Sequence, residues 1–345
     1  MPKHESFLAG FSAPDSEFKD ISPEQFGQEF DQLIQYRRRH EEVVIADLIK
    51  TWKEKREAVI LAHNYVPAEV QDVADFVGDS LQLAQKAKEL KAKVIVLAGV
   101  TFMAETAKIV NPEATVLMPD KTAGCPMADM VTAEDIKQFR ALYPDGYVVS
   151  YVNTTAAVKA ESDVCVTSSN AFDIMTQLSD KENILFVPDR NLGHCVMHTA
   201  LRDDVMLWHG CCPVHDRIMP YHVAAAKDEH PGAEVLMHPE CAPDTRQEAD
   251  WLESTGGMLK FMEKESCNDE YIIATEEGLL HQLQKRFPQK KFYGLNPPVI
   301  CQSMKQITPM RVLACMQRMV PAVELPADIM ERARKPIERM LEMSK

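Results

Sequence analysis

The feature that most constrains this 345-residue chain is an internal repeat with a spacing of 87–89 residues. Three sets of polar residues, each close to the end of an apolar run, recur at this spacing in the same order. The first set is His63, Tyr151 and His238, the second is Ser80, Ser168 and Thr255, and the third is Cys125, Cys212 and Cys301. A period this long exceeds the unit of a solenoid, so it predicts three small homologous domains.

Each repeat has the pattern of alternating strands and helices. Short apolar runs bounded by polar residues indicate buried parallel strands. The helices expected between them cover residues 68–76, 80–90, 171–178 and 244–252, and residues 163–167 supply an additional strand in the second repeat. Such alternation produces a parallel sheet with helices on both faces. We therefore predict an α/β protein of three homologous three-layer (αβα) domains with short parallel sheets in a pseudo-threefold arrangement.

The repeat also sets the expected domain boundaries. We expect an N-terminal extension and helix packing on the first repeat at residues 1–56, α/β repeats at 57–144, 145–231 and 232–301, and a C-terminal helical segment at 302–345.

Composition indicates which partners are disfavoured and in which compartment we expect the protein. The net charge of −14 argues against nucleic acid or an anionic membrane as the main partner. No apolar run approaches the ~18 residues that a membrane-spanning helix needs. The first residues lack the apolar centre of a signal peptide, so we expect a cytoplasmic protein.

Nine cysteines are unusual in that setting. An odd number in a reducing compartment makes a disulfide framework a poor explanation. Cys165 lies in an apolar strand and Cys315 in a helix, so both are expected to be core residues. We assign no chemistry to four others, which are Cys195, Cys211, Cys241 and Cys267.

The remaining three cysteines each follow the last strand of a repeat. Ligands of open parallel sheets bind beyond the carboxyl ends of the strands, so equivalent strand ends can face one axis. Three converging thiolates suit either zinc or an iron–sulfur cluster, and the absence of a Cys-x-x-Cys pair favours the cluster. His209 and His215, beside Cys212, keep zinc open as an alternative. A cluster held by three cysteines leaves one iron open as a Lewis acid.

Longer motifs connect these residues to a known family. They are AHNY at 62–65, GDSLQLA at 78–84, GVTFMAETAKIVNP at 99–112, SYVNTTAAVKAESD at 150–163, TSSNA at 167–171, PDRNLG at 188–193, HGCCPVHD at 209–216, HPE at 238–240, STGGM at 254–258 and CQSMKQIT at 301–308. In unbroken order from about residue 58 to 310, the chain resembles the quinolinate synthase (NadA) family.

The resemblance implies condensation of iminoaspartate with dihydroxyacetone phosphate to quinolinate, with release of phosphate and water, in de novo NAD synthesis. It also implies one [4Fe–4S] cluster per chain at the centre of the three domains, held by Cys125, Cys212 and Cys301. The family pattern Gly-x-Cys-x-Val-His-Asp selects Cys212 over Cys211. An enzyme that oxidises L-aspartate is the implied supplier of iminoaspartate.

The strand-end residues then acquire expected roles. Anionic substrates need donors, which we assign to His63, Ser80, Ser168, His238 and Thr255. Glu240 is the candidate general acid or base, Tyr65 and Tyr151 are candidates for proton relay or substrate orientation, and Asn153 is a candidate for carbonyl or carboxylate binding. Phe102 and Met103 are expected to form a wall of the pocket.

Two other classes of protein share part of this pattern. Another [4Fe–4S] hydro-lyase acting on a small hydroxy acid would share the three thiolates but needs no phosphate pocket. A non-catalytic cluster-binding sensor would expose a partner surface, which the acidic charge does not favour.

Overall fold

The computed structural model describes residues 41, 43–264 and 268–344, and the chain divides into two compact units, residues 1–45 and 46–345. Residues 41 and 43–45 of the first unit are helical. The fold and the site described below belong to the second unit. Most of the expected extension at 1–56, together with Cys267, lies outside the described residues.

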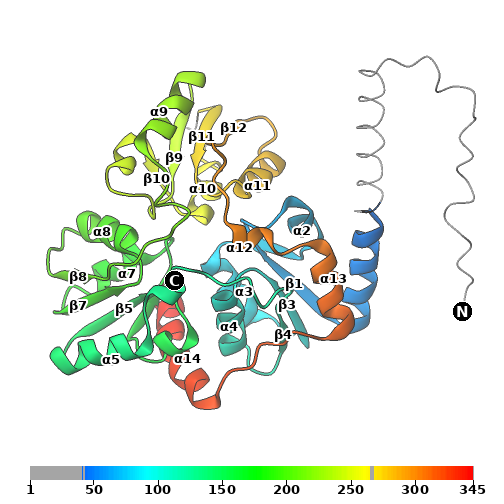
Figure 1. Ribbon diagram of the computed structural model, residues 1–345, viewed down its shortest axis with the longest axis horizontal. Helices are drawn as coiled ribbons and strands as arrows, with labels where there is room; N and C mark the ends of the chain where they lie inside the picture. The colour runs from blue at the N-terminus through cyan, green and yellow to red at the C-terminus, as the bar shows by residue number, and fades with distance from the viewer. Residues whose placement is uncertain (1–40, 42, 265–267, 345) are drawn as a thin grey trace, which may run out of the picture. The chain divides into compact units, whose positions relative to one another are not determined.

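The second unit contains three four-stranded parallel sheets, and the strands follow the same order in each sheet (Figure 1). The orders are β2-β1-β3-β4, β6-β5-β7-β8 and β10-β9-β11-β12. The strands are β1 (Ala58–His63), β2 (Phe76–Gly78), β3 (Val94–Ala98), β4 (Thr115–Leu117), β5 (Tyr147–Tyr151), β6 (Val164–Val166), β7 (Ile184–Val187), β8 (Val205–Leu207), β9 (Glu234–Met237), β10 (Trp251–Leu252), β11 (Glu270–Ala274) and β12 (Lys291–Tyr293). The predicted α/β fold with three sheets is confirmed.

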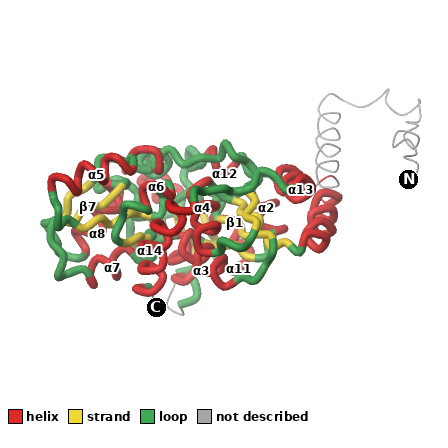
Figure 2. The backbone as a smooth tube through the Cα atoms, turned by 90° about the horizontal axis from the view of Figure 1, so that it is seen from below, coloured by secondary structure: helices red, strands yellow, loops and turns green. Residues whose placement is uncertain are grey.

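Helices connect these strands and cover the sheets. They are α2 (Ala68–Val73), α3 (Ser80–Glu89), α4 (Thr101–Val110), α5 (Ala133–Leu142), α6 (Ala156–Lys159), α7 (Ala171–Gln177), α8 (Arg190–Thr199), α9 (Pro220–Glu229), α10 (Thr255–Phe261), α11 (Leu279–Arg286), α12 (Gln302–Lys305), α13 (Pro309–Arg318) and α14 (Ala327–Met343), with short 3₁₀ turns η1 (Ala128–Met130) and η2 (Thr245–Glu248). Figure 2 shows the strands between helices such as α5 and α12 on one side and α7 and α11 on the other.

Burial explains why the strands are continuous apolar runs. Ile60 and Leu61 of β1, Val148 of β5 and Val235 and Leu236 of β9 are fully buried. Strands covered on both faces need apolar side chains on both. The last helix, α14, packs against α4, α6 and β6 and so joins the first repeat to the second.

An aspartate before each edge strand is a repeat signature that the sequence reading missed. The carboxylates of Asp75, Asp163 and Asp250 accept hydrogen bonds from the backbone N–H of Ile60, Val148 and Val235, at 2.8, 2.7 and 2.8 Å. Each aspartate therefore fixes an edge strand beside the central strand of its sheet.

This contact also corrects two predicted helices. Residues 244–252 form η2 and then the edge strand β10, because Asp250 bonds to Val235 instead of continuing a helix. Residues 68–76 form α2 only as far as Val73, after which β2 begins at Phe76. The extra strand expected only in the second repeat is thus present in all three.

Across the described part of the chain, every helix is too short or too polar to cross a lipid bilayer.

Candidate functional site

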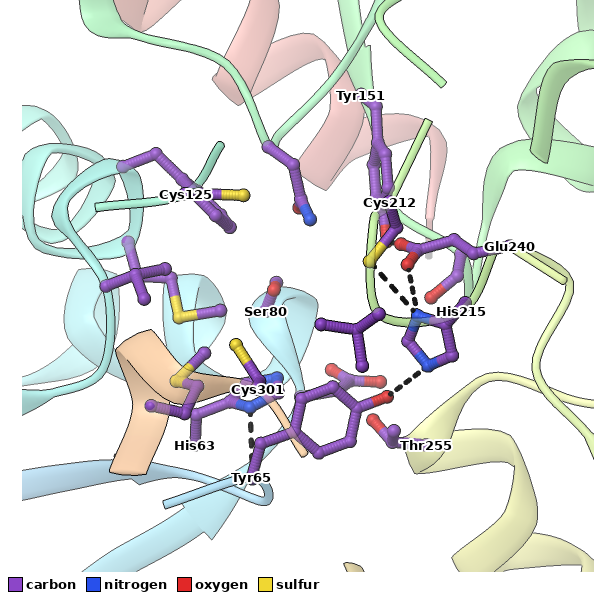
Figure 3. Close-up of a pocket in the computed structure, with 18 of the residues that line it drawn as sticks. His63, Tyr65, Ser80, Cys125, Tyr151, Cys212, His215, Glu240, Thr255 and Cys301 are labelled. Atoms are coloured by element: carbon purple, nitrogen blue, oxygen red, sulfur yellow. Dashed lines mark hydrogen bonds and ion pairs between the residues drawn. The ribbon is translucent and has the colours of Figure 1, made fainter. Parts of the chain in front are cut away.

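One pocket lies at the carboxyl ends of the three sheets, and every residue that the sequence assigned to the cluster or the substrates lines it (Figure 3). The free volume is about 80 Å³. A space of this size suits small molecules. The site residues come from strand ends because parallel strands of one sheet all end at the same edge.

A three-way contact at one side of the pocket joins the repeats. The Ser169 hydroxyl donates to Asp79 Oδ2 at 2.6 Å and lies 2.7 Å from the Ser254 hydroxyl. Each repeat supplies one of these three residues. Gly256 makes this approach possible, since a Cβ at that position would lie only 2.3 Å from Asp79 Oδ2. The three loops are thereby held at fixed positions around the pocket.

Two of the expected anion-binding residues begin helices beside this contact. Ser80 is the first residue of α3, where Asp79 and Gln82 form a reciprocal capping box. Thr255 is the first residue of α10, which Ser254 caps through Gly257 N–H at 2.9 Å. The first N–H groups of a helix lack partners within the helix and favour anions. Ser168, the equivalent in the second repeat, precedes α7 and hydrogen-bonds the Tyr151 side chain.

The two strand-end histidines share one backbone arrangement. Tyr65 N–H donates to His63 Nδ1 at 3.2 Å, and Glu240 N–H donates to His238 Nδ1 at 3.3 Å. Burial lowers the pKa of each imidazole to about 3, despite the opposing effect of Glu240. Both rings are therefore neutral near pH 7, and with Nδ1 accepting, each carries its proton on Nε2.

A continuous hydrogen-bond chain runs through the pocket wall. Tyr65 Oη lies 2.7 Å from Thr275 Oγ1, which lies 2.8 Å from His215 Nε2. His215 Nδ1 lies 2.7 Å from Glu240 Oε2, and because an ionised carboxylate only accepts, Nδ1 is the donor. His215 Nε2 can then accept a proton that originates at Tyr65 and passes through Thr275.

The same carboxylate accepts from a second tyrosine. Tyr151 Oη donates to Glu240 Oε1 at 2.5 Å. Burial opposes ionisation of Glu240, but His238, His215 and the Tyr151 hydroxyl outweigh it and hold the pKa of this carboxyl below its usual range. Burial, together with Glu240, raises the pKa of Tyr65 and Tyr151 well above the ordinary value. The carboxylate is ionised and both phenols are neutral.

The sequence reading placed His215 near the cysteines but missed Thr275. Thr275 follows β11, the third strand of its repeat, whereas the repeated polar residues follow the first, second and last strands. Its polar character after a buried run was the only available signal.

Asn153, Phe102 and Met103 lie on the part of the wall nearest the first two repeats. Phe102 and Met103 are buried on α4. Asn153 Oδ1 is buried without a hydrogen-bond partner among the described residues. Buried polar atoms are normally satisfied, so this one marks a place where a bound polar group belongs.

The three cysteines point into the same pocket from three loops (Figure 3). Burial raises the pKa of Cys125 to about 12, and Cys301 contributes to the increase. Burial also raises the pKa of Cys212, helped by Glu240 and Cys125. Cys125 is thus within electrostatic reach of both other thiols. All eight cysteines of the described residues carry free thiols.

The other cysteines and the two nearby histidines lie in different surroundings. Cys165, Cys241 and Cys315 are buried. Cys211 is partly exposed, and its N–H contacts the sulfur of Met130 at 3.4 Å, outside the pocket lining. His209 is exposed, whereas His215 Nδ1 lies 3.3 Å from Cys212 Sγ. The side chains of Cys212, His215 and Glu240 also place ligand atoms within 4.8 Å of one another.

Fold and pocket together define a class of protein: a three-repeat α/β protein whose internal site combines thiols, neutral histidines and a hydrogen-bond chain that ends on a carboxylate. Comparison with known proteins narrows the class. Residues 47–342 match the family described as Quinolinate synthetase A protein, NadA. Quinolinate synthase of Desulforudis audaxviator is 49% identical over 293 residues, covering 85% of this chain and 96% of that protein. Quinolinate synthase of Pyrococcus abyssi is 46% identical over 303 residues, covering 87% of this chain and 99% of that protein. The chain belongs to the quinolinate synthase family.

Proposed function

We propose that this chain condenses iminoaspartate with dihydroxyacetone phosphate to form quinolinate, one phosphate and two waters, a step of NAD biosynthesis. The observation that carries the proposal is the single pocket in which three thiols, anion-binding helix starts and the Tyr65–Thr275–His215–Glu240 chain meet. The reaction joins two small anions and removes protons, phosphate and hydroxyl groups, and each of these tasks has a matching group there.

The donor set fits an iron–sulfur cluster. Cys125, Cys212 and Cys301 are three free thiols, one from each repeat, that line a single pocket, and cysteine thiolates are the ligands of iron–sulfur clusters. His215 and Glu240 are less available as ligands for zinc, since they already bond each other and contact Thr275 and Tyr151. We therefore assign the three cysteines to one [4Fe–4S] cluster. When bound, an open iron of such a cluster supplies Lewis acidity toward a substrate hydroxyl.

The first task of the chain's own residues is to bind two anions. Ser80 and Thr255, at the starts of α3 and α10, offer hydroxyl and backbone N–H donors to a phosphate or carboxylate. His63 and His238 add neutral Nε2–H donors, which bind an anion without adding charge. The unpartnered Oδ1 of Asn153 can accept a hydrogen bond from an N–H or O–H group of a substrate.

The second task is proton transfer. Tyr65 faces the pocket and can release a proton through Thr275 to His215 Nε2, while the Glu240 carboxylate stabilises the imidazolium that forms. Glu240 acts through His215 in this step. Tyr151 holds the opposite oxygen of the same carboxylate and so fixes its orientation.

The alternatives differ in what the pocket must hold. A hydro-lyase for a small hydroxy acid needs no second anion site, yet helix starts from the first and third repeats line this pocket. A cluster-binding sensor needs neither the proton chain nor a pocket for two small anions. We also infer that iminoaspartate comes from an enzyme that oxidises L-aspartate.

The test is anaerobic purification of the full chain, iron and sulfide analysis, and an assay with both substrates. We expect about four irons per chain, as for a cubane cluster, and formation of quinolinate with equimolar phosphate. Stoichiometric zinc without iron would overturn the cluster assignment. An iron-loaded protein that makes no quinolinate but dehydrates a hydroxy acid would favour the hydro-lyase.

A further inference from the structure

A buried ion pair outside the proton chain connects the third cysteine loop to the first repeat. Glu276 follows β11 and is fully buried, and Lys305 is the last residue of α12. Lys305 Nζ lies 2.8 Å from Glu276 Oε1 and 3.1 Å from Oε2. An isolated carboxylate does not persist at such depth, so Glu276 depends on Lys305, whose side chain is 21% exposed.

The carboxylate of Glu276 holds the cysteine loop by its backbone. Glu276 Oε1 accepts from Cys301 N–H at 3.0 Å, and Oε2 accepts from Gly278 N–H at 2.8 Å. Lys305 lies one helical turn beyond Cys301, whose carbonyl accepts from Lys305 N–H at 3.1 Å. The loop that presents the Cys301 thiol is therefore fixed at both its N–H and its C=O.

The ammonium of Lys305 holds the tyrosine turn in the same way. Its Nζ donates to the Tyr65 carbonyl at 2.9 Å. From the other side, Gln71 Nε2 donates to the carbonyls of Asn64, Val66 and Gly278 at 2.9, 2.8 and 2.9 Å. The backbones approach closely here, because a Cβ on Gly278 would lie 2.9 Å from the Asn64 oxygen.

We propose that Glu276 and Lys305 are positioning residues that set the Cys301 thiol and the Tyr65 hydroxyl in fixed relation to one another. The pair touches neither group directly; it acts on the backbone of both loops. The catalytic consequence rests on the proposed function, because it requires that Cys301 holds a cluster and that Tyr65 starts the proton chain. The structural consequence, a restrained Cys301 loop, does not.

Two variants test the pair. Lys305→Met leaves Glu276 as a buried unpaired charge, whereas the double variant E276Q/K305M removes both charges and so avoids that penalty. Lys285→Met is the matched control, since Lys285 forms an exposed ion pair with Asp72 at 2.6 Å. Thermal unfolding of the full chain establishes that each variant is folded.

The first measurement uses the metal-free full chain and reads the rate of Cys301 alkylation by iodoacetamide. Mass spectrometry follows Cys301 and, in the same sample, Cys125. We expect Cys301 to react about tenfold faster in both variants, because the loop opens locally, with Cys125 unchanged. Lys285→Met should match the parent chain at both cysteines.

The second measurement uses the cluster-loaded protein. Misplacement of reacting groups by about 1 Å costs up to about a hundredfold in rate. We expect kcat to fall by about tenfold to a hundredfold in the double variant, while KM for dihydroxyacetone phosphate changes less than about twofold.

A folded double variant with the parent's Cys301 alkylation rate and kcat would overturn the proposal. A fall in kcat with no change in alkylation would also contradict it, because the cysteine loop would then not depend on the pair. If the parent chain itself binds no iron and makes no quinolinate, the proposed function fails, and the alkylation rates still decide whether the pair positions Cys301.

Discussion

The turn at residues 63–65 and the turn at residues 238–240 are equivalent places in the first and third repeats, and they differ in one side chain that faces the pocket. In both, the backbone N–H of the third residue donates to Nδ1 of the first, a histidine that lines the pocket. The third residue is Tyr65 in one turn and Glu240 in the other. The shared part fixes a neutral donor, and the differing part places a phenol opposite a carboxylate.

This difference shows how a repeated architecture acquires an asymmetric site. Thr275 and His215 join the two unlike residues into one hydrogen-bond chain, with the phenol at one end and the ionised carboxylate at the other. Ends of different basicity give proton transfer along such a chain a preferred direction. In the proposed function the two histidines remain alike because both hold an anion.

Among the variants that test this comparison, replacement of Glu240 should reduce kcat the most. Glu240→Gln keeps the shape but removes the charge that stabilises a protonated His215. We expect kcat to fall by about a thousandfold, within the range for general acid–base catalysis, with iron content unchanged. Steady-state kinetics on the iron-loaded variant measures this. An unchanged kcat would mean that the third-repeat turn contributes only structure.

Replacement of Thr275 should interrupt the chain between the two turns. Thr275→Val removes the bridging hydroxyl at nearly constant volume, and Tyr65 Oη remains 3.4 Å from His215 Nε2. Because this longer contact partly substitutes for the bridge, we expect a kcat loss of about a hundredfold or less. Thr245→Val, which removes another fully buried hydroxyl, is the control for stability alone. Equal kcat values in the two variants would contradict the proposed role of the hydrogen-bond chain.

Gly256 tests whether the first and third repeats must touch. In Gly256→Ala the new methyl group displaces Asp79 and weakens its bond from Ser169. We expect a loss of about 2 kcal/mol in the free energy of unfolding, typical of overpacking. Gly232→Ala serves as the control, since a Cβ added to Gly232 would enter open space. Similar denaturant midpoints for both variants would argue against a fixed three-way contact.

The histidines give a smaller, pH-dependent effect. The unfolded chain protonates each imidazole below about pH 6.5, whereas folded His63 and His238 stay neutral until about pH 3. The contribution of the two neutral histidines to the free energy of unfolding is therefore fully present above pH 6.5. It falls as the pH drops toward 3, by about 1 kcal/mol per histidine at pH 5.5.

His63→Gln and His238→Gln should each remove one such contribution, and to the same extent if the two turns are equivalent. Urea unfolding of the metal-free chain at pH 7 and 5.5 measures it. A pH dependence identical to that of the parent chain would show that the rings are not held neutral.

The fold could be predicted from the sequence because three copies of one strand–helix pattern are harder to misread than one. The residues at the ends of β1, β5 and β9 could also be predicted, because they repeat in register. Thr275 and Glu276 were not predicted, because their importance comes from contacts with loops more than 200 residues earlier or about 25 later in the chain. The helix predicted at 244–252 was wrong because periodicity does not reveal that Asp250 bonds a neighbouring strand.

The central claim is that one thiol from each repeat reaches a common metal site. The most direct measurement is the iron content of anaerobically purified Cys212→Ser and Cys211→Ser, two neighbours of which only Cys212 lines the pocket. We predict about four irons per chain in Cys211→Ser and almost none in Cys212→Ser. The reverse result, or equal iron in both variants, would contradict the claim.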